Sequence, residues 1–157
     1  MQQPEEWAKS LHDEIREEQE TQALSNQALI VKQGLINAHA SDVFDEIARA
    51  FQNHCNEYNK VEPKPALVFT KTGAHSFLVR RDAGFSELIL EYKPQTKSIH
   101  IYADNCSLDD TYRLTVASDG ETVILVKQHH GIPVHPSKIA QSAIRTFIKA
   151  REPLVYV

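Results

Sequence analysis

The spacing of apolar residues changes near residue 66, and this change limits the possible folds more than any other feature of the sequence. Before it, apolar residues recur every three to four positions, the period of a helix. From residue 66 to 128 they alternate with polar residues, the period of a strand, and a final helical pattern follows. Helices and strands thus occupy separate parts of the chain, which predicts an α+β fold.

Six runs with the two-residue period predict six strands. The segments between them contain turn-forming residues and are too short for the crossover that parallel strands need. We therefore expect an antiparallel meander, with one apolar face covered by helices that include a C-terminal one. The predicted strands span residues 66–71, 75–81, 85–93, 97–103, 111–117 and 121–128.

The first 24 residues predict an acidic helical arm. Pro4 suits the first turn of a helix, and Trp7, Leu11 and Ile15 are spaced by four residues, which gives one narrow apolar stripe. A helix with so narrow a stripe is not stable alone in water, so it packs against the body, packs against another chain, or frays. We expect these three residues to bind a protein partner or a second copy, and residues 25–157 to form a single domain.

A second helical pattern begins after Ser25 and Asn26, which are favourable N-cap residues, and runs to Tyr58. Gly34 and residues 39–42 are weak points, so one kinked helix and two consecutive helices are both allowed. Prolines then end the helical pattern.

Two further elements are expected after the strands. The last helix covers residues 139–148 and starts from His135-Pro136-Ser137. Apolar residues 154–157 predict an added edge strand or a partner contact.

Charge is distributed unevenly along the chain. The formal net charge is −4, yet residues 1–20 carry seven acidic and two basic residues, a net −5, so the remainder sums to +1. A protein surface without a positive field binds phosphate backbones weakly, so nucleic-acid binding is not expected. We also expect no membrane partner and a cytoplasmic location, since no apolar run of about eighteen residues and no signal peptide is apparent.

The two cysteines, Cys55 and Cys106, do not lie in a CxxC or CxxH motif and are expected to be reduced thiols. Cys55 fits the apolar stripe of the second helical pattern, which favours core packing. Cys106 lies among the carboxylates of residues 104–110, which could hold a hard cation or supply a nucleophile. This loop lacks the regular ligand spacing of a calcium site, so a solvated hairpin connection is the favoured interpretation.

Three histidines in residues 129–135 form the first candidate chemical site. The two adjacent ones point to opposite sides of an extended segment, which leaves His130 and His135 as a possible pair. Asp104, or an acid at 109–110, would supply a third metal ligand. A solvated loop that leads into the last helix explains the same residues.

His100, Tyr102 and Arg113 are expected on the polar face of the sheet and are a candidate ligand-binding surface. No nucleotide-binding, serine-hydrolase, zinc-protease or EF-hand motif is present, so no catalytic residue and no cofactor is assigned. The preferred hypothesis is a non-enzymatic interaction or ligand-binding module that forms homo-oligomers. The alternative is a small metal-dependent or acid–base enzyme that uses the histidines at 129, 130 and 135.

Overall fold

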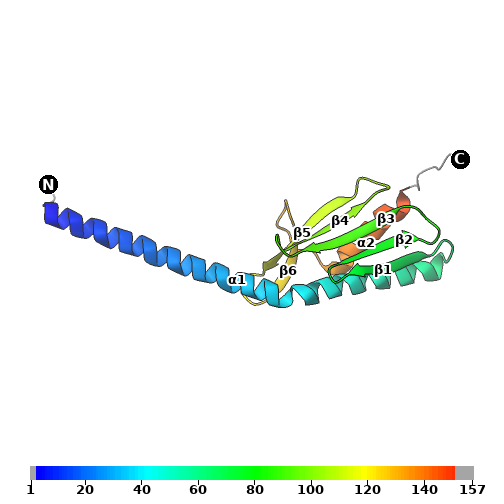
Figure 1. The fold of residues 1–157 in the computed structure, drawn as a ribbon, viewed down its shortest axis with the longest axis horizontal. Coiled ribbons are helices and arrows are strands. Elements are labelled where there is room, and N and C mark those ends of the chain that lie inside the picture. Colours follow the sequence, from blue (N-terminus) through cyan, green and yellow to red (C-terminus); the bar gives the residue numbers. More distant parts are fainter. Residues whose placement is uncertain (1–2, 151–157) are drawn as a thin grey trace.

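The computed structural model describes residues 3–150 and has the predicted order of elements. A long helix, α1 (Pro4–Val61), comes first, and a shorter helix, α2 (Pro136–Lys149), comes last (Figure 1). The α+β class is confirmed, and the predicted tail at 154–157 lies outside the described residues. The strands are β1 (Leu67–Gly73), β2 (Ser76–Arg81), β3 (Glu87–Lys93), β4 (Ser98–Ala103), β5 (Asp109–Val116) and β6 (Val123–Lys127).

The six strands form one sheet in chain order, and each neighbouring pair is antiparallel. This is the predicted meander. The two-residue period places alternate side chains on opposite faces: Leu88 and Leu90 of β3 are buried, while Glu87 and Glu91 are only partly buried and lie on the outer face. The sheet therefore has one apolar and one largely polar face.

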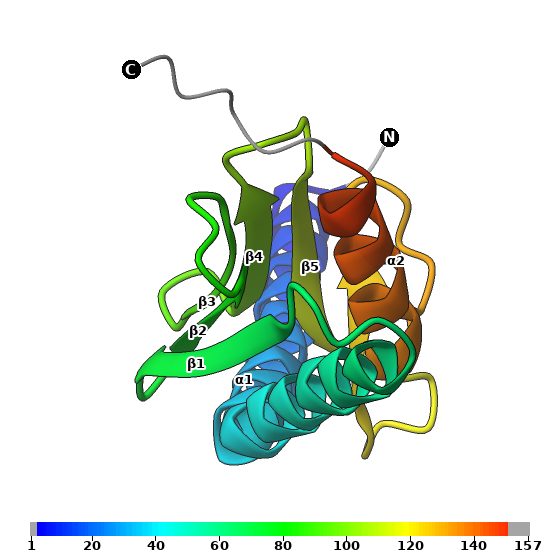
Figure 2. The ribbon, with the colours of Figure 1, turned by 90° about the vertical axis from the view of Figure 1, so that its right-hand side faces the viewer.

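Both helices lie on the apolar face of the sheet. The second half of α1 and α2 contact each other there and cross at an angle (Figure 2). Phe51 of α1, Phe77 of β2 and Phe147 of α2 are almost completely buried, and the ring centroids of Phe51 and Phe77 are 5.1 Å apart. Each such ring stabilises the fold by about 1.5–3 kcal/mol through burial.

Helix α1 is continuous, which differs from the expected division into an arm and a second helix. It runs through Ser25, Asn26 and Gly34 with no interruption across its 58 residues. Serine and asparagine cap a helix only where the preceding backbone is not helical, and the residues before Ser25 are good helix formers. Within residues 3–150, neither helix is both long and apolar enough to cross a membrane.

Two polar side chains attach the helices to the sheet. The side-chain amide of Asn59 donates to the carbonyl of Leu67 at 2.8 Å and accepts from its amide at 2.7 Å, which links the end of α1 to β1. Arg81, at the end of β2, donates to the carbonyl oxygens of Ile148 and Ala150 at the end of α2. Each side chain thereby satisfies backbone groups that the end of an element leaves without a partner.

Candidate functional site

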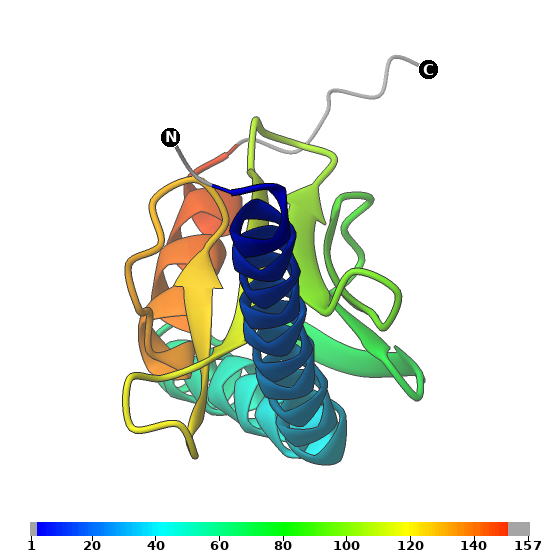
Figure 3. The ribbon, with the colours of Figure 1, turned by 90° about the vertical axis from the view of Figure 1, so that its left-hand side faces the viewer.

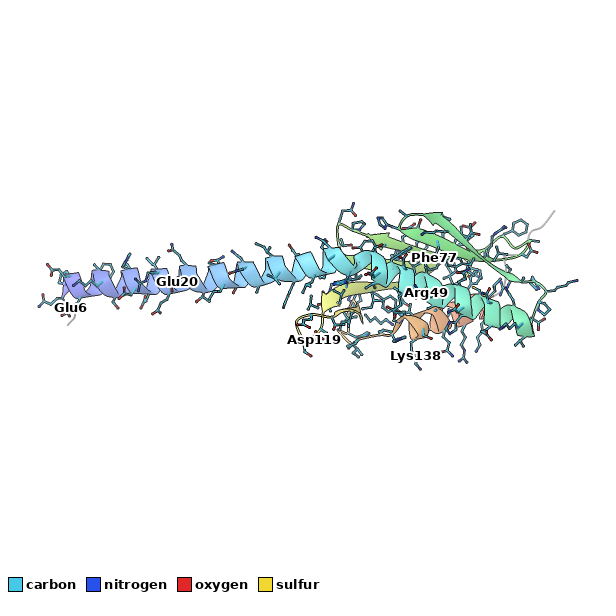
Figure 4. All side chains as sticks on the ribbon, turned by 90° about the horizontal axis from the view of Figure 1, so that it is seen from below. Glu6, Glu20, Arg49, Phe77, Asp119 and Lys138 are labelled. Carbon is cyan, nitrogen blue, oxygen red and sulfur yellow. The ribbon has the colours of Figure 1, made fainter. Side chains whose placement is uncertain are left out.

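The first half of α1 projects from the body as a free helix. Every residue from 3 to 34 is exposed, and the first buried residue of α1 is Ile36. We call residues 4–34 the projecting arm. It extends away from the sheet and α2 in Figure 1 and toward the viewer in Figure 3, and Figure 4 shows Glu6 and Glu20 along it. The exposed part of the helix thus continues well past residue 24, the expected end of the arm.

The three predicted interaction residues lie on the projecting arm. Trp7 is 59% exposed, Leu11 39% and Ile15 44%. Packing of the arm on its own sheet, which the sequence allowed, is not what the structure has. The stripe is therefore a free apolar surface in the isolated chain.

The stripe continues the side of α1 that faces the core. A helix turns by about 100° per residue, and on this count Trp7, Leu11, Ile15 and Leu29 lie on the same side of the helix as Ile36. Polar residues interrupt the stripe between Ile15 and Leu29. A second helix packed along this side of α1 would have one end directed at the sheet.

The arm also carries a second apolar group, near the body, that sequence analysis did not identify. Leu24 is 69% exposed, Ile30 68% and Val31 56%. Leu24 and Val31 are seven residues apart, with Ala28 between them and Leu35 four residues further on. This alternation of four- and three-residue steps is the spacing of a helix-pairing face, and it is visible in the sequence.

A hollow of about 360 Å³ lies where the projecting arm meets the body, and we call it the junction hollow. Its walls come from α1 at residues 29–36, from the turn at 95–97 and from β5 at 113–116. Lys32, Lys97 and Arg113 give it three cationic side chains over an apolar lining. No ion pair involving Lys32 or Arg113 is seen within the described part of the chain.

The predicted ligand surface is only partly assembled. His100 and Tyr102 stack with ring centroids 4.7 Å apart, and His100 Nε2 lies 2.5 Å from Asp109 Oδ1. The hydroxyl of Tyr102 donates to Glu91 at 3.1 Å. Partial burial raises the pKa of Tyr102, and this hydrogen bond raises it further.

Arg113 lies on the same outer face but lines a different hollow. Its partner across the ladder is Ser98, whereas His100 pairs with Thr111 and lines a hollow of about 340 Å³ beside residues 106–109. The three residues expected to act together are thus divided between two hollows.

The predicted metal ligands are held by separate contacts. The carboxylate of Asp104 accepts from the amide of Glu87 at 2.9 Å, and His135 Nδ1 accepts from the amide of Ser137 at the start of α2. His130 is exposed in the turn after β6. Among residues 3–150, no three His, Cys, Asp or Glu side chains are grouped so that they could hold a metal ion. The structure therefore does not bring His130, His135 and Asp104 together.

Both cysteines are free thiols. Cys55 is 1% exposed and belongs to the core, as predicted, and burial raises its pKa to about 11. The neighbouring His54 donates from Nδ1 to the carbonyl oxygen of Ala50 at 2.8 Å. Cys55 is thus a packing residue rather than a nucleophile.

The sequence matches no known protein family, and no curated protein and no solved structure is significantly similar to the chain. The function is accordingly inferred from the surfaces described above.

Proposed function

We propose that the protein is a non-enzymatic interaction module that self-associates through its projecting arm. The observation that carries this proposal is the exposure of α1 over residues 4–34, together with an apolar stripe at four-residue spacing. The projecting arm packs against no other element of the chain, and most helical stability in proteins comes from tertiary packing. A second helix along the stripe would provide that packing.

The stripe has the composition of a contact surface. Trp7 is a large aromatic side chain at its outer end, and Leu11 and Ile15 follow it on the same side of the helix. Aromatic anchors of this kind dominate the energy of many protein interfaces. Burial of each side chain on association contributes up to about 1.5–3 kcal/mol and so favours a reversible association.

The proposal includes a cytoplasmic location. It is supported by the two free thiols, since disulfides are rare in reducing compartments.

Sedimentation of the full chain tests the proposed function. The unmodified protein is expected to sediment as an oligomer, and a Trp7→Ser/Leu11→Ser/Ile15→Ser variant as a monomer, because serine removes the apolar area that association buries. Phe85→Ser is the matched control: Phe85 is 73% exposed on the body, and its loss is expected to leave the oligomer intact. A monomeric unmodified chain over the whole accessible concentration range would contradict the proposal.

A further inference from the structure

We propose, on the basis of the self-association above, that the projecting arms of two copies pair in opposite directions. In this pair, Trp7 of each copy enters the junction hollow of the other. The occupant of both the stripe and the hollow is thus a second copy of this chain. The distribution of charge, the register of the stripe and the lining of the hollow each lead to this arrangement.

The charge of the arm favours opposite directions. Residues 1–20 carry a net −5, whereas Lys32 is the only Asp, Glu, Lys or Arg in residues 21–40. Parallel pairing places the two acidic segments side by side, where they repel each other. Antiparallel pairing places each acidic segment beside the neutral-to-basic segment of the other copy, and its first turn beside the three cations of the hollow. Complementary charge of this kind selects one orientation over another.

The stripe sets the register. With Leu11 opposite Leu29 of the second copy, the two-fold axis passes near residue 20 and Ile15 lies opposite Ser25. Each contact then occurs twice, as a symmetric pair requires. In this register Glu18 and Gln22, two polar residues of the interruption, lie opposite each other near the axis, whereas Ser25 lies opposite Ile15.

The same register brings the end of each arm to the body of the other copy. Pro4 lies opposite Ile36, where α1 becomes buried, and Trp7 lies one turn away, beside the junction hollow. The hollow, at about 360 Å³, is at the lower end of the range of binding pockets, about 300 to 1,000 Å³, and has room for one large side chain. Val116, which is partly exposed, lines the hollow and can contact the indole.

The acidic residues that precede Trp7 complete the fit. Glu5 and Glu6 belong to the first turn of α1, so they reach the hollow together with the indole. Arg113 and Lys97 line its rim and are suited to pair with these carboxylates. The arm end and the hollow therefore match in charge.

Cross-linking between two variants tests the direction. Both carry Cys106→Ser, because Cys106 is partly exposed whereas Cys55 is buried. One variant has Ile15→Cys and the other Ser25→Cys, and both positions are exposed, so the fold is retained. Antiparallel pairing predicts that a disulfide forms when the two are mixed and in neither alone, because like positions are then about 15 Å apart along the axis. A disulfide in Ile15→Cys alone would show parallel pairing and overturn the proposal.

The emission of Trp7 tests occupation of the hollow, because Trp7 is the only tryptophan. Association is expected to shift its emission to shorter wavelength. Arg113→Glu is expected to reverse this shift and weaken association by about tenfold, and Glu6→Arg in the same chain to restore both. Lys138→Glu is the control, since it makes the same charge change at an exposed position on α2 (Figure 4).

The outcomes separate this proposal from the proposed function. If the chain associates through Trp7, Leu11 and Ile15 but Arg113→Glu leaves association and emission unchanged, the hollow is not the site, while the interaction function stands. If the unmodified chain is monomeric, both proposals fail.

Discussion

At the scale of single residues, Arg81 explains how a charged side chain can occupy the inner face of the sheet. The alternation of β2 places Phe77, Val79 and Arg81 on the same face. The guanidinium reaches past the end of the core to the last carbonyls of α2, and it lies 5.3 Å from the centroid of the Phe147 ring. A cation at a helix C-terminus is also favoured by the helix dipole.

Replacement of Arg81 by methionine is expected to lower the free energy of unfolding by about 1–3 kcal/mol. The apolar stem is retained, but the carbonyls of Ile148 and Ala150 lose a charged hydrogen-bond donor. Urea unfolding followed by circular dichroism measures the change. Arg80→Met, on the outer face, is expected to shift stability by no more than about 0.5 kcal/mol; equal effects of the two variants would refute the role of Arg81.

Asp119 gives the turn before β6 a dependence on pH. Its carboxylate accepts hydrogen bonds from the side chain and amide of Thr122 and from the amide of Glu121, and these lower its pKa to about 2. The pKa of an aspartate in an unfolded chain is about 3.9. Because the folded pKa is the lower one, the stabilisation is present above about pH 4 and is lost progressively as the pH falls through about 2.

Asp119→Ala is therefore expected to melt at a lower temperature than the unmodified protein at pH 7. The difference between the two melting temperatures is expected to shrink between about pH 4 and pH 2 and to vanish below it. Calorimetry across this range makes the comparison. A difference that stays constant down to pH 2 would mean that the carboxylate is not the stabilising group.

At the scale of elements, Gly34 is a position where the sequence indicates a weak point and the structure has an unbroken helix. A Cβ at Gly34 would meet no heavy atom within 4 Å. Gly34→Ala is expected to raise the free energy of unfolding by about 0.5–1 kcal/mol, since alanine loses less backbone entropy in a helix.

Gly120→Ala is the matched contrast, because Gly120 has a φ of 75°, which is strained for any residue with a Cβ. It is expected to lower stability where Gly34→Ala raises it. Denaturant unfolding of both variants gives the two signs, and destabilisation by Gly34→Ala would show that α1 is not helical there.

The elements themselves were largely predictable, and their boundaries were less so. Period-two alternation and short turns determine a meander because each depends on neighbouring residues alone. The continuity of α1 past Ser25 could not be predicted, since the same residue type can stand at an N-cap or inside a helix. The choice between them depends on whether the preceding turn is helical.

At the scale of the whole molecule, the candidate sites were harder to predict than the fold. Arg113 was predicted to bind a ligand, but as part of one surface with His100 and Tyr102. Its hollow joins α1, a turn and β5, which are distant in sequence, and no local pattern reports that contact. The metal hypothesis had the same weakness, because it required Asp104 and His130 to meet across the fold.

Dilution provides a test of the proposed self-association. If the protein self-associates as proposed, dilution removes the packing of the projecting arm, which is then expected to fray, so the helical circular dichroism signal falls. The near-ultraviolet signal of the tyrosines in the body is expected to stay constant. A helical signal that is independent of concentration while the sedimentation coefficient changes would show that the arm is stable on its own.

The length of α1 also makes it a molecular ruler. At about 1.5 Å per residue, its 58 residues measure about 87 Å, more than half of which lies outside the body. Two bodies joined through such arms would be held at a spacing encoded in the number of helical turns. Removal of seven residues would shorten that spacing by about 10 Å while returning the apolar stripe almost to its original side.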